Sequence, residues 1–88
     1  MAKYKILVSA SAEKVLKGLP KKDLAKVAIT VQSLASDPFP LGCRKLAGEK
    51  NVFRLRQGSY RIIYEVFKSE LIIHILKVGH RKDVYRGI

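Results

Sequence analysis

The chain is poor in the residues that form covalent and metal-stabilised sites. Of its 88 residues, one is cysteine, two are histidine and none is tryptophan. The single cysteine, Cys43, excludes a disulfide within the chain and favours a reducing compartment, so we expect a cytoplasmic protein. No cluster with the spacing of metal ligands surrounds His74 or His80, so we expect neither a metal nor another cofactor.

The sequence also lacks long apolar runs and glycine-rich loops. No run approaches the roughly 20 apolar residues of a membrane-spanning helix, so we expect no membrane partner. Ile6-Leu7-Val8 is too short for the hydrophobic region of a signal peptide and predicts a strand instead. No glycine-rich phosphate loop precedes a helix, and no convincing Ser/His/Asp or Cys/His set is present.

Negative charge is scarce in this chain. It has 18 Lys and Arg against 7 Asp and Glu, which gives a net charge of +11 and a pI of about 10.1. Residues 1–43 have seven basic and three acidic residues, and residues 44–88 have eleven and four, so the excess is larger in the C-terminal half. A field of this sign attracts nucleic acid, an acidic protein or an anionic surface. A solvated basic surface without a partner is the alternative.

The length and the apolar pattern predict one small domain, residues 1–88. Alternation over residues 4–8 predicts a first strand. Apolar residues at helical spacing predict two helices that meet at Gly18-Leu19-Pro20, the second of which is stopped by Asp37-Pro38. From residue 52 the period changes to two and predicts three further strands, at 52–56, 60–67 and 71–78.

This order of elements predicts an α+β fold. The N-terminal strand, a two-helix hairpin and a three-stranded antiparallel meander would form a four-stranded sheet with the helices packed on one face. Leu46, in the segment after the second helix, is expected to complete the core. Tyr60 and Tyr64 alternate with Ile62 on one strand face and are expected to be core residues. His74 lies inside an apolar strand and is expected to be structural.

Cationic residues recur at the strand ends of the predicted meander. Arg54 and Arg56 share the strand face opposite Phe53 and Leu55. Because the first and third strands of a meander end on the same side, the groups at these ends are expected to converge on one rim. The predicted rim contains six residues: Arg54, Arg56, Arg61, His80, Arg81 and Tyr85.

This set of residues suits the cleavage of RNA by its own 2′-hydroxyl, which attacks the adjacent phosphorus. The nucleophile belongs to the substrate, so the protein has to supply a proton acceptor, a proton donor and positive charge. Histidine suits proton transfer because its ordinary pKa is about 6.5, and arginine binds two phosphate oxygens at once. Tyr85 is expected to stack on a base or to orient the 2′-hydroxyl.

Each of these assignments has a structural alternative. Arg54 and Arg56 would then form a solvated strand face. Arg61 would be an ion-pair partner of Glu65, and Tyr85 would pack over the core. The sequence leaves these alternatives open.

The ordered set of motifs resembles the RelE/ParE toxin superfamily, and in particular its RelE-type mRNA interferases. The resemblance covers nearly the whole chain. Its most specific parts are Tyr60-Arg61-Ile62-Ile63-Tyr64 and Gly79-His80-Arg81-Lys82-Asp83-Val84-Tyr85. It implies a RelE-like fold and a type II toxin that cleaves mRNA without metal, leaves a 2′,3′-cyclic phosphate and so inhibits translation. The partners that it implies are mRNA, the A site of the ribosome and an acidic cognate antitoxin.

Site residues are carried over from the resemblance by position. Arg61 matches a phosphate-contacting arginine, Arg81 a residue assigned to the leaving group, and Tyr85 the C-terminal tyrosine of the family. His80 stands where relatives carry lysine or histidine. These four residues are the implied catalytic set.

The resemblance also implies RNA-binding residues. Arg54 and Arg56 match a pair of basic residues that are often lysines in relatives, and Lys45 and Lys82 are assigned to RNA binding with them. Arginine is a poor base because its pKa exceeds about 12. The leading assignment for proton transfer is therefore His80, and Arg61 and Arg81 are left to stabilise the pentacoordinate phosphorane.

Two other functions are compatible with the sequence. One is a ParE-like inhibitor that binds DNA gyrase and catalyses nothing. The other is a nucleic-acid-binding module or a catalytically inactive relative. The grouping of Arg61, His80, Arg81 and Tyr85 favours cleavage, because a pure binder does not need basic groups and a tyrosine gathered at one rim.

Overall fold

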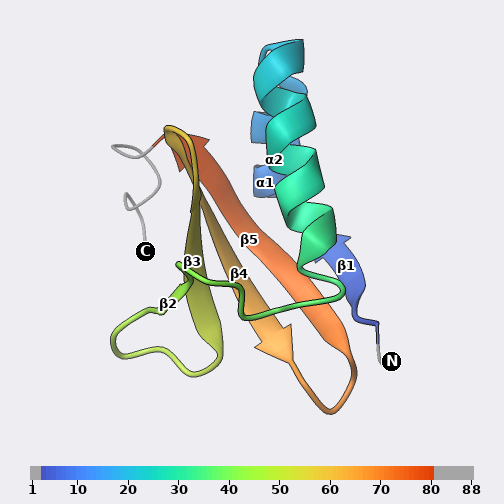
Figure 1. The fold of residues 1–88 in the computed structure, drawn as a ribbon, viewed down its shortest axis with the longest axis vertical. Helices are drawn as coiled ribbons and strands as arrows, with labels where there is room; N and C mark the ends of the chain where they lie inside the picture. The colour runs from blue at the N-terminus through green and yellow to red at the C-terminus, as the bar shows by residue number, and fades with distance from the viewer. Residues whose placement is uncertain (1–2, 81–88) are drawn as a thin grey trace.

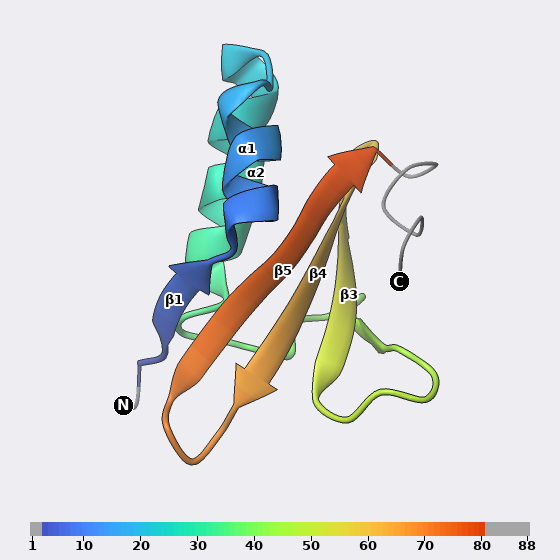
Figure 2. The same cartoon turned by 180° about the vertical axis from the view of Figure 1, so that it is seen from behind.

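Two helices pack against one face of a five-stranded sheet in the computed structural model, which describes residues 3–80 (Figure 1). The elements follow the chain in the order β1 (Lys5–Val8), α1 (Ala10–Lys17), α2 (Lys21–Ser33), β2 (Arg44–Lys45), β3 (Val52–Gln57), β4 (Tyr60–Phe67) and β5 (Ile72–His80). In space the strands are ordered β1-β5-β4-β3-β2. Strand β1 runs parallel to β5, and the other neighbouring pairs are antiparallel (Figure 2). The predicted α+β class is confirmed.

The sheet has one strand more than the predicted four. The additional strand, β2, is two residues long and pairs with β3, so that Arg44 lies opposite Arg54 and Lys45 lies opposite Phe53. Two residues show no alternation in sequence, so the pattern did not reveal this strand. The loop before it turns at Gly42, whose φ of 95° suits glycine.

The boundaries of β4 agree with the predicted strand at 60–67, whereas β5 is shifted from the predicted 71–78. Leu71 has a φ of 56° and belongs to the turn before β5. At its other end β5 continues to His80, which pairs with Tyr60.

A β-bulge interrupts the pairing of β4 with β5. Tyr64 lies opposite Ile75, but the preceding residue Ile63 lies opposite Lys77, which leaves Leu76 as the additional residue on β5. A bulge of this kind changes which side chains lie opposite one another beyond it.

Ser9 begins α1 and connects it to the bulge. Its Oγ caps the helix by accepting a hydrogen bond from the backbone N–H of Ala12 at 3.0 Å. The same hydroxyl donates to the carbonyl of Leu76 at 2.8 Å. Neither helix in residues 3–80 has the length and apolarity needed to cross a membrane.

The main core lies between the helices and the sheet. Leu34, Ile62 and Tyr64 are fully buried in it, and Tyr60 packs against it half-buried, so these tyrosines are core residues as predicted. The Tyr64 hydroxyl donates to the carbonyl of Pro38 at 2.8 Å, and burial raises the pKa of that hydroxyl. Strands β4 and β5 are thereby fixed beneath the helices.

A smaller apolar cluster lies on the opposite face of the sheet. It contains the buried side chains of Val52 and Ile63, with Leu46 and Leu76 packed against them. Leu46 was expected to complete the core, and it packs on this smaller cluster and not on the main core between the helices and the sheet. Leu46 follows β2, its N–H bonds to the carbonyl of Val52, and its side chain lies on the face away from the helices.

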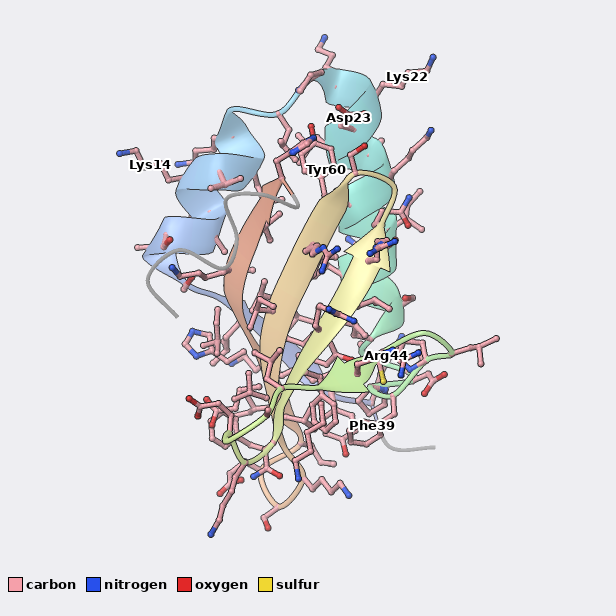
Figure 3. The ribbon with its side chains drawn as sticks, turned by 90° about the vertical axis from the view of Figure 1, so that its left-hand side faces the viewer. Lys14, Lys22, Asp23, Phe39, Arg44 and Tyr60 are labelled. Atoms are coloured by element: carbon pink, nitrogen blue, oxygen red, sulfur yellow. The ribbon has the colours of Figure 1, made fainter. Side chains whose placement is uncertain are left out.

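Hydrogen bonds from α2 hold the turn between β3 and β4. The Tyr60 hydroxyl donates to Oδ2 of Asp23 at 2.9 Å, and Thr30 Oγ1 donates to Oε1 of Gln57 at 2.8 Å. Figure 3 shows Asp23 and Tyr60 side by side where α2 faces this turn. The end of the sheet that carries Arg56 and Arg61 is thus fixed to the helix layer.

The bond to Asp23 raises the pKa of Tyr60 above its ordinary value of 10.0, with smaller contributions from burial and from the carboxylate charge. The pKa of Tyr60 is therefore higher in the folded than in the unfolded protein. Its contribution to stability is present below pH 10 and is lost as the pH rises through the raised pKa. Asp23→Asn is expected to lower the pKa of Tyr60. The measurement is an ultraviolet titration of phenolate, with the Tyr60→Phe spectrum subtracted.

The control for this titration is Glu13→Gln, which removes a carboxylate from α1, where Glu13 pairs with Lys17. This variant should leave the ionisation of Tyr60 unchanged. If Asp23→Asn also leaves it unchanged, the hydrogen bond is not what raises the pKa.

Candidate nucleic-acid interface

Two pairs of arginines lie opposite one another on neighbouring strands. Arg44 of β2 is opposite Arg54 of β3, and Arg56 of β3 is opposite Arg61 of β4. Residues paired in this way project from the same face of a sheet, with Cβ atoms about 4.5–5.5 Å apart. Because Arg54 is also opposite Ile63 of the smaller cluster, all four arginines lie on the face away from the helices. We call Arg44, Arg54, Arg56 and Arg61 the arginine face.

Three residues of the arginine face, Arg44, Arg54 and Arg56, line a hollow of about 370 Å³. Arg44 and Arg56 are exposed, whereas Arg54 and Arg61 are half-buried and the Nε atom of Arg61 is shielded from solvent. Figure 3 shows Arg44 at the strand edge that borders the hollow. The six described residues that line it include no acid: Leu41, Gly42, Arg44, Arg54, Leu55 and Arg56.

Like charges opposite one another destabilise a sheet, and guanidinium groups bind phosphate oxygens in pairs. A ligand that carries phosphate therefore suits both arginine pairs. The geometry of this face suits a chain of phosphates better than a single small anion, because the two pairs lie in successive rows along β3.

Arg56, Arg61 and Gly79 lie opposite one another on three neighbouring strands, so this row of paired residues ends in a glycine. Arg61 lies opposite Gly79 of β5, and the neighbouring row places Lys77 opposite Ile63. A glycine within a strand often marks a place where a ligand or another backbone approaches closely. Gly79 itself is buried, and Lys77 lies in the neighbouring row.

The structure separates Lys45 from Arg54 and Arg56, with which it was predicted to bind RNA. Lys45 is opposite Phe53, which packs on the main core, so its side chain leaves from the face that carries the helices. Arg44, which the sequence reasoning missed, takes the corresponding place beside Arg54. Only the pairing of β2 with β3 distinguishes these two neighbours, and the sequence contains no signal for it.

The side chain of His80 also lies apart from the arginine face. His80 is opposite Tyr60, and their ring centroids are 6.1 Å apart with the ring planes at 81°. Since Tyr60 points towards α2, the imidazole lies on the helix side of the strand end. The backbone of His80 nevertheless adjoins Gly79, in the row of Arg61.

The structure thus brings Arg54, Arg56 and Arg61 together on one face and adds Arg44. The remaining predicted site residues, Arg81, Lys82 and Tyr85, lie outside the described residues. His74 is half-buried and lies opposite Glu65 on the same sheet face as Ile63. Within residues 3–80 no group of three or more His, Cys, Asp or Glu side chains is placed to hold a metal ion.

Comparison with known proteins agrees with this architecture. The sequence model of the ParE toxin of type II toxin–antitoxin systems matches residues 6–85. Toxin RelG of Mycobacterium tuberculosis is 33% identical over 87 residues, which cover 94% of this chain and 97% of that protein.

Solved structures show the same fold. The toxin–antitoxin complex RelBE2 from Mycobacterium tuberculosis matches with a TM-score of 0.81 and 29% identity, over 94% of this chain and 97% of the matching chain. The archaeal RelE–RelB complex from Pyrococcus horikoshii also gives a TM-score of 0.81 at 29% identity, over 96% of this chain and 100% of the matching one. Sequence and structure together place this chain in the RelE/ParE superfamily of type II toxin–antitoxin toxins.

Proposed function

We propose that this toxin is a metal-independent endoribonuclease that cleaves mRNA on the ribosome, in the cytoplasm, and thereby inhibits translation. The observation that carries the proposal is the arginine face, where two opposed arginine pairs share one side of the sheet and three of the four arginines, Arg44, Arg54 and Arg56, line a hollow with no acid among its described lining residues. A row of phosphates is the ligand that offsets this charge.

The reaction uses the 2′-hydroxyl of the RNA as nucleophile. Its oxygen bonds to the adjacent phosphorus while the bond from phosphorus to the 5′-oxygen breaks, which gives a 2′,3′-cyclic phosphate and a 5′-hydroxyl. One proton leaves the 2′-oxygen and one reaches the departing 5′-oxygen. The protein therefore has to hold the phosphate, stabilise its additional negative charge and transfer two protons.

Arg61 is proposed to stabilise the phosphorane, with Arg44, Arg54 and Arg56 holding the phosphates on either side. Arg61 is half-buried, which reduces screening of its charge by water, and it lies opposite Gly79 of β5. Arg81 and Tyr85 are proposed to act at the leaving group and the base, as the family resemblance implies.

His80 is the proposed group for proton transfer. It ends β5 beside the row of Arg61 and Gly79, and its ring lies against Tyr60. For His80 to act, the RNA must cross the strand end, so that the scissile linkage reaches the helix side while its neighbouring phosphates stay on the arginine face.

An acidic cognate antitoxin is the proposed protein partner. The RelBE2 complex of Mycobacterium tuberculosis and the RelE–RelB complex of Pyrococcus horikoshii each contain an antitoxin with their toxin. The net charge of +11 in this chain favours an acidic partner that covers the arginine face and competes with RNA.

A second candidate function is inhibition of DNA gyrase without catalysis, because the matching sequence model is that of ParE toxins. The opposed arginine pairs favour RNA cleavage over this function. The two functions differ in whether Arg61 is needed for growth inhibition.

Arg61→Ala is expected to lower the rate of RNA cleavage by about two powers of ten or more, since it removes a main contact to the transition state. The rate is measured with purified protein and translating ribosomes. Lys14→Ala, which removes a cation from the exposed surface of α1, serves as control and should cleave normally (Figure 3). Growth inhibition that survives Arg61→Ala while DNA supercoiling fails would establish the gyrase function instead.

Arg44→Ala and Lys45→Ala form a matched pair, because each removes one cation from β2 on opposite faces of the sheet. Arg44→Ala is expected to reduce the slope of log binding constant against log salt concentration by about 0.7, the value for one phosphate contact on a single strand. Lys45→Ala should leave the slope nearly unchanged. Binding is measured with a 2′-O-methyl RNA oligonucleotide that cannot be cleaved, and a larger effect of Lys45→Ala would contradict the proposed surface.

His80→Ala is expected to flatten the acidic limb of the pH–rate profile for cleavage, because the variant lacks the imidazole that is proposed to transfer the proton. The protein should still bind the 2′-O-methyl oligonucleotide, since the arginine face is unchanged. An acidic limb that stays the same in this variant would remove His80 from the proton-transfer step.

A further inference from the structure

A second hollow lies on the other side of the strand end, between α2 and the β3–β4 turn. Its volume is about 410 Å³, within the range of about 300–1,000 Å³ that is usual for ligand pockets. Eight residues line it: Asp23, Lys26, Val27, Gln57, Gly58, Ser59, Tyr60 and His80. We call it the tip hollow.

The tip hollow combines flat surfaces with fixed polar groups. Tyr60 and His80 supply two rings set at 81° to one another, and Val27 is fully buried at the base. The carboxylate of Asp23 is held in place by the Tyr60 hydroxyl at 2.9 Å, and the amide of Gln57 is held by Thr30. Polar groups that are fixed in this way select a ligand by its hydrogen-bonding pattern.

Asp23 determines which hydrogen-bonding groups a ligand of the tip hollow should carry. A carboxylate only accepts hydrogen bonds and has about four lone-pair positions, of which the Tyr60 hydroxyl uses one. The preferred ligand therefore offers N–H donors. Lys26 supplies a cation at the same hollow, which suits a ligand that also carries phosphate.

The tip hollow adjoins the arginine face through the backbone. Each of the three strands has two consecutive residues here whose side chains lie on opposite faces of the sheet. Gln57, Tyr60 and His80 lie on the side of the hollow, and their neighbours Arg56, Arg61 and Gly79 lie on the side of the arginine face. An RNA strand whose phosphates lie on the arginine face therefore has a neighbouring nucleotide at the mouth of the hollow.

We propose that the tip hollow holds one nucleobase of the RNA beside the cut, and that Asp23 selects a base with an exocyclic amino group over uracil. The proposal rests on the proposed RNA cleavage. Cytosine, adenine and guanine each present an amino group to a carboxylate, whereas uracil has carbonyl oxygens at the corresponding positions, which the carboxylate repels. Unpaired bases held by stacking and edge contacts are the usual targets of sequence-specific RNA recognition.

The first experiment maps cut sites in an RNA library that is randomised around the cut. The native protein is expected to cut RNA with uracil at one flanking position about tenfold less often than RNA with the other bases. Asp23→Asn should abolish that discrimination, because an amide also donates. Glu13→Gln is the matched control: it makes the same kind of carboxylate-to-amide change on α1, outside the hollow, so the discrimination should persist.

The second experiment measures binding without cleavage. Cytidine 5′-monophosphate and uridine 5′-monophosphate are titrated into the native protein, and the amide resonances of Ser59 and His80 are followed by NMR. The cytidine nucleotide is expected to bind about tenfold more tightly. Lys26→Glu should weaken its binding about tenfold, whereas Lys22→Glu, the same change one helical turn away and outside the hollow, should not (Figure 3).

The two experiments separate this inference from the proposed function. Native protein that cuts RNA with the same base profile as Asp23→Asn, and binds both nucleotides equally, overturns the inference and leaves the nuclease intact. Native protein that cuts no RNA overturns the proposed function. In that case, tighter binding of the cytidine nucleotide that depends on Asp23 still supports base recognition by the hollow, and equal binding of the two nucleotides overturns it.

Discussion

Backbone pairing holds Arg44 opposite Arg54 and Arg56 opposite Arg61 on a single face of the sheet. The packed core maintains that register, because a slip of one residue would turn Leu55 out to solvent and the arginines towards the helices. Apolar burial on one side of the sheet therefore sustains a concentration of like charge on the other. Arginines held in this register suit the proposed polyanionic ligand, which physically connects the fold with the proposed function.

The end of the sheet divides into two surfaces that share three strands. Alternation sends Arg56 and Arg61 to one side and Tyr60 and His80 to the other, where α2 contributes a carboxylate and a lysine. One side offers charge without selectivity for bases, and the other offers rings and fixed polar groups. A single strand of RNA that crosses this end would meet both surfaces in turn, so affinity and selectivity can reside in different residues.

Much of the fold follows from the sequence alone. Period-two alternation identified the strand that carries Arg54 and Arg56, and helical spacing identified both helices, because these patterns reflect burial on one side of each element. Strand β2 and the place of Arg44 were not predictable, since a strand of two residues is too short to show an alternation of apolar and polar side chains. The side on which His80 lies was not predictable either, because it depends on the pairing of β4 with β5 across a bulge.

That bulge determines on which side the final residues of β5 emerge. With regular pairing from Tyr64 onwards, Lys77 would lie under the helices, Val78 would lie opposite Arg61, and His80 would emerge beside the arginines. In the observed register beyond the bulge, Val78 is buried and the imidazole of His80 is oriented towards α2. The Ser9 hydroxyl donates to the carbonyl of Leu76, 67 positions away in the sequence, so the start of the first helix is bonded directly to the bulge of the last strand. Transferring the imidazole to the other side would require the bulge to migrate, at the cost of placing an ammonium group in the core.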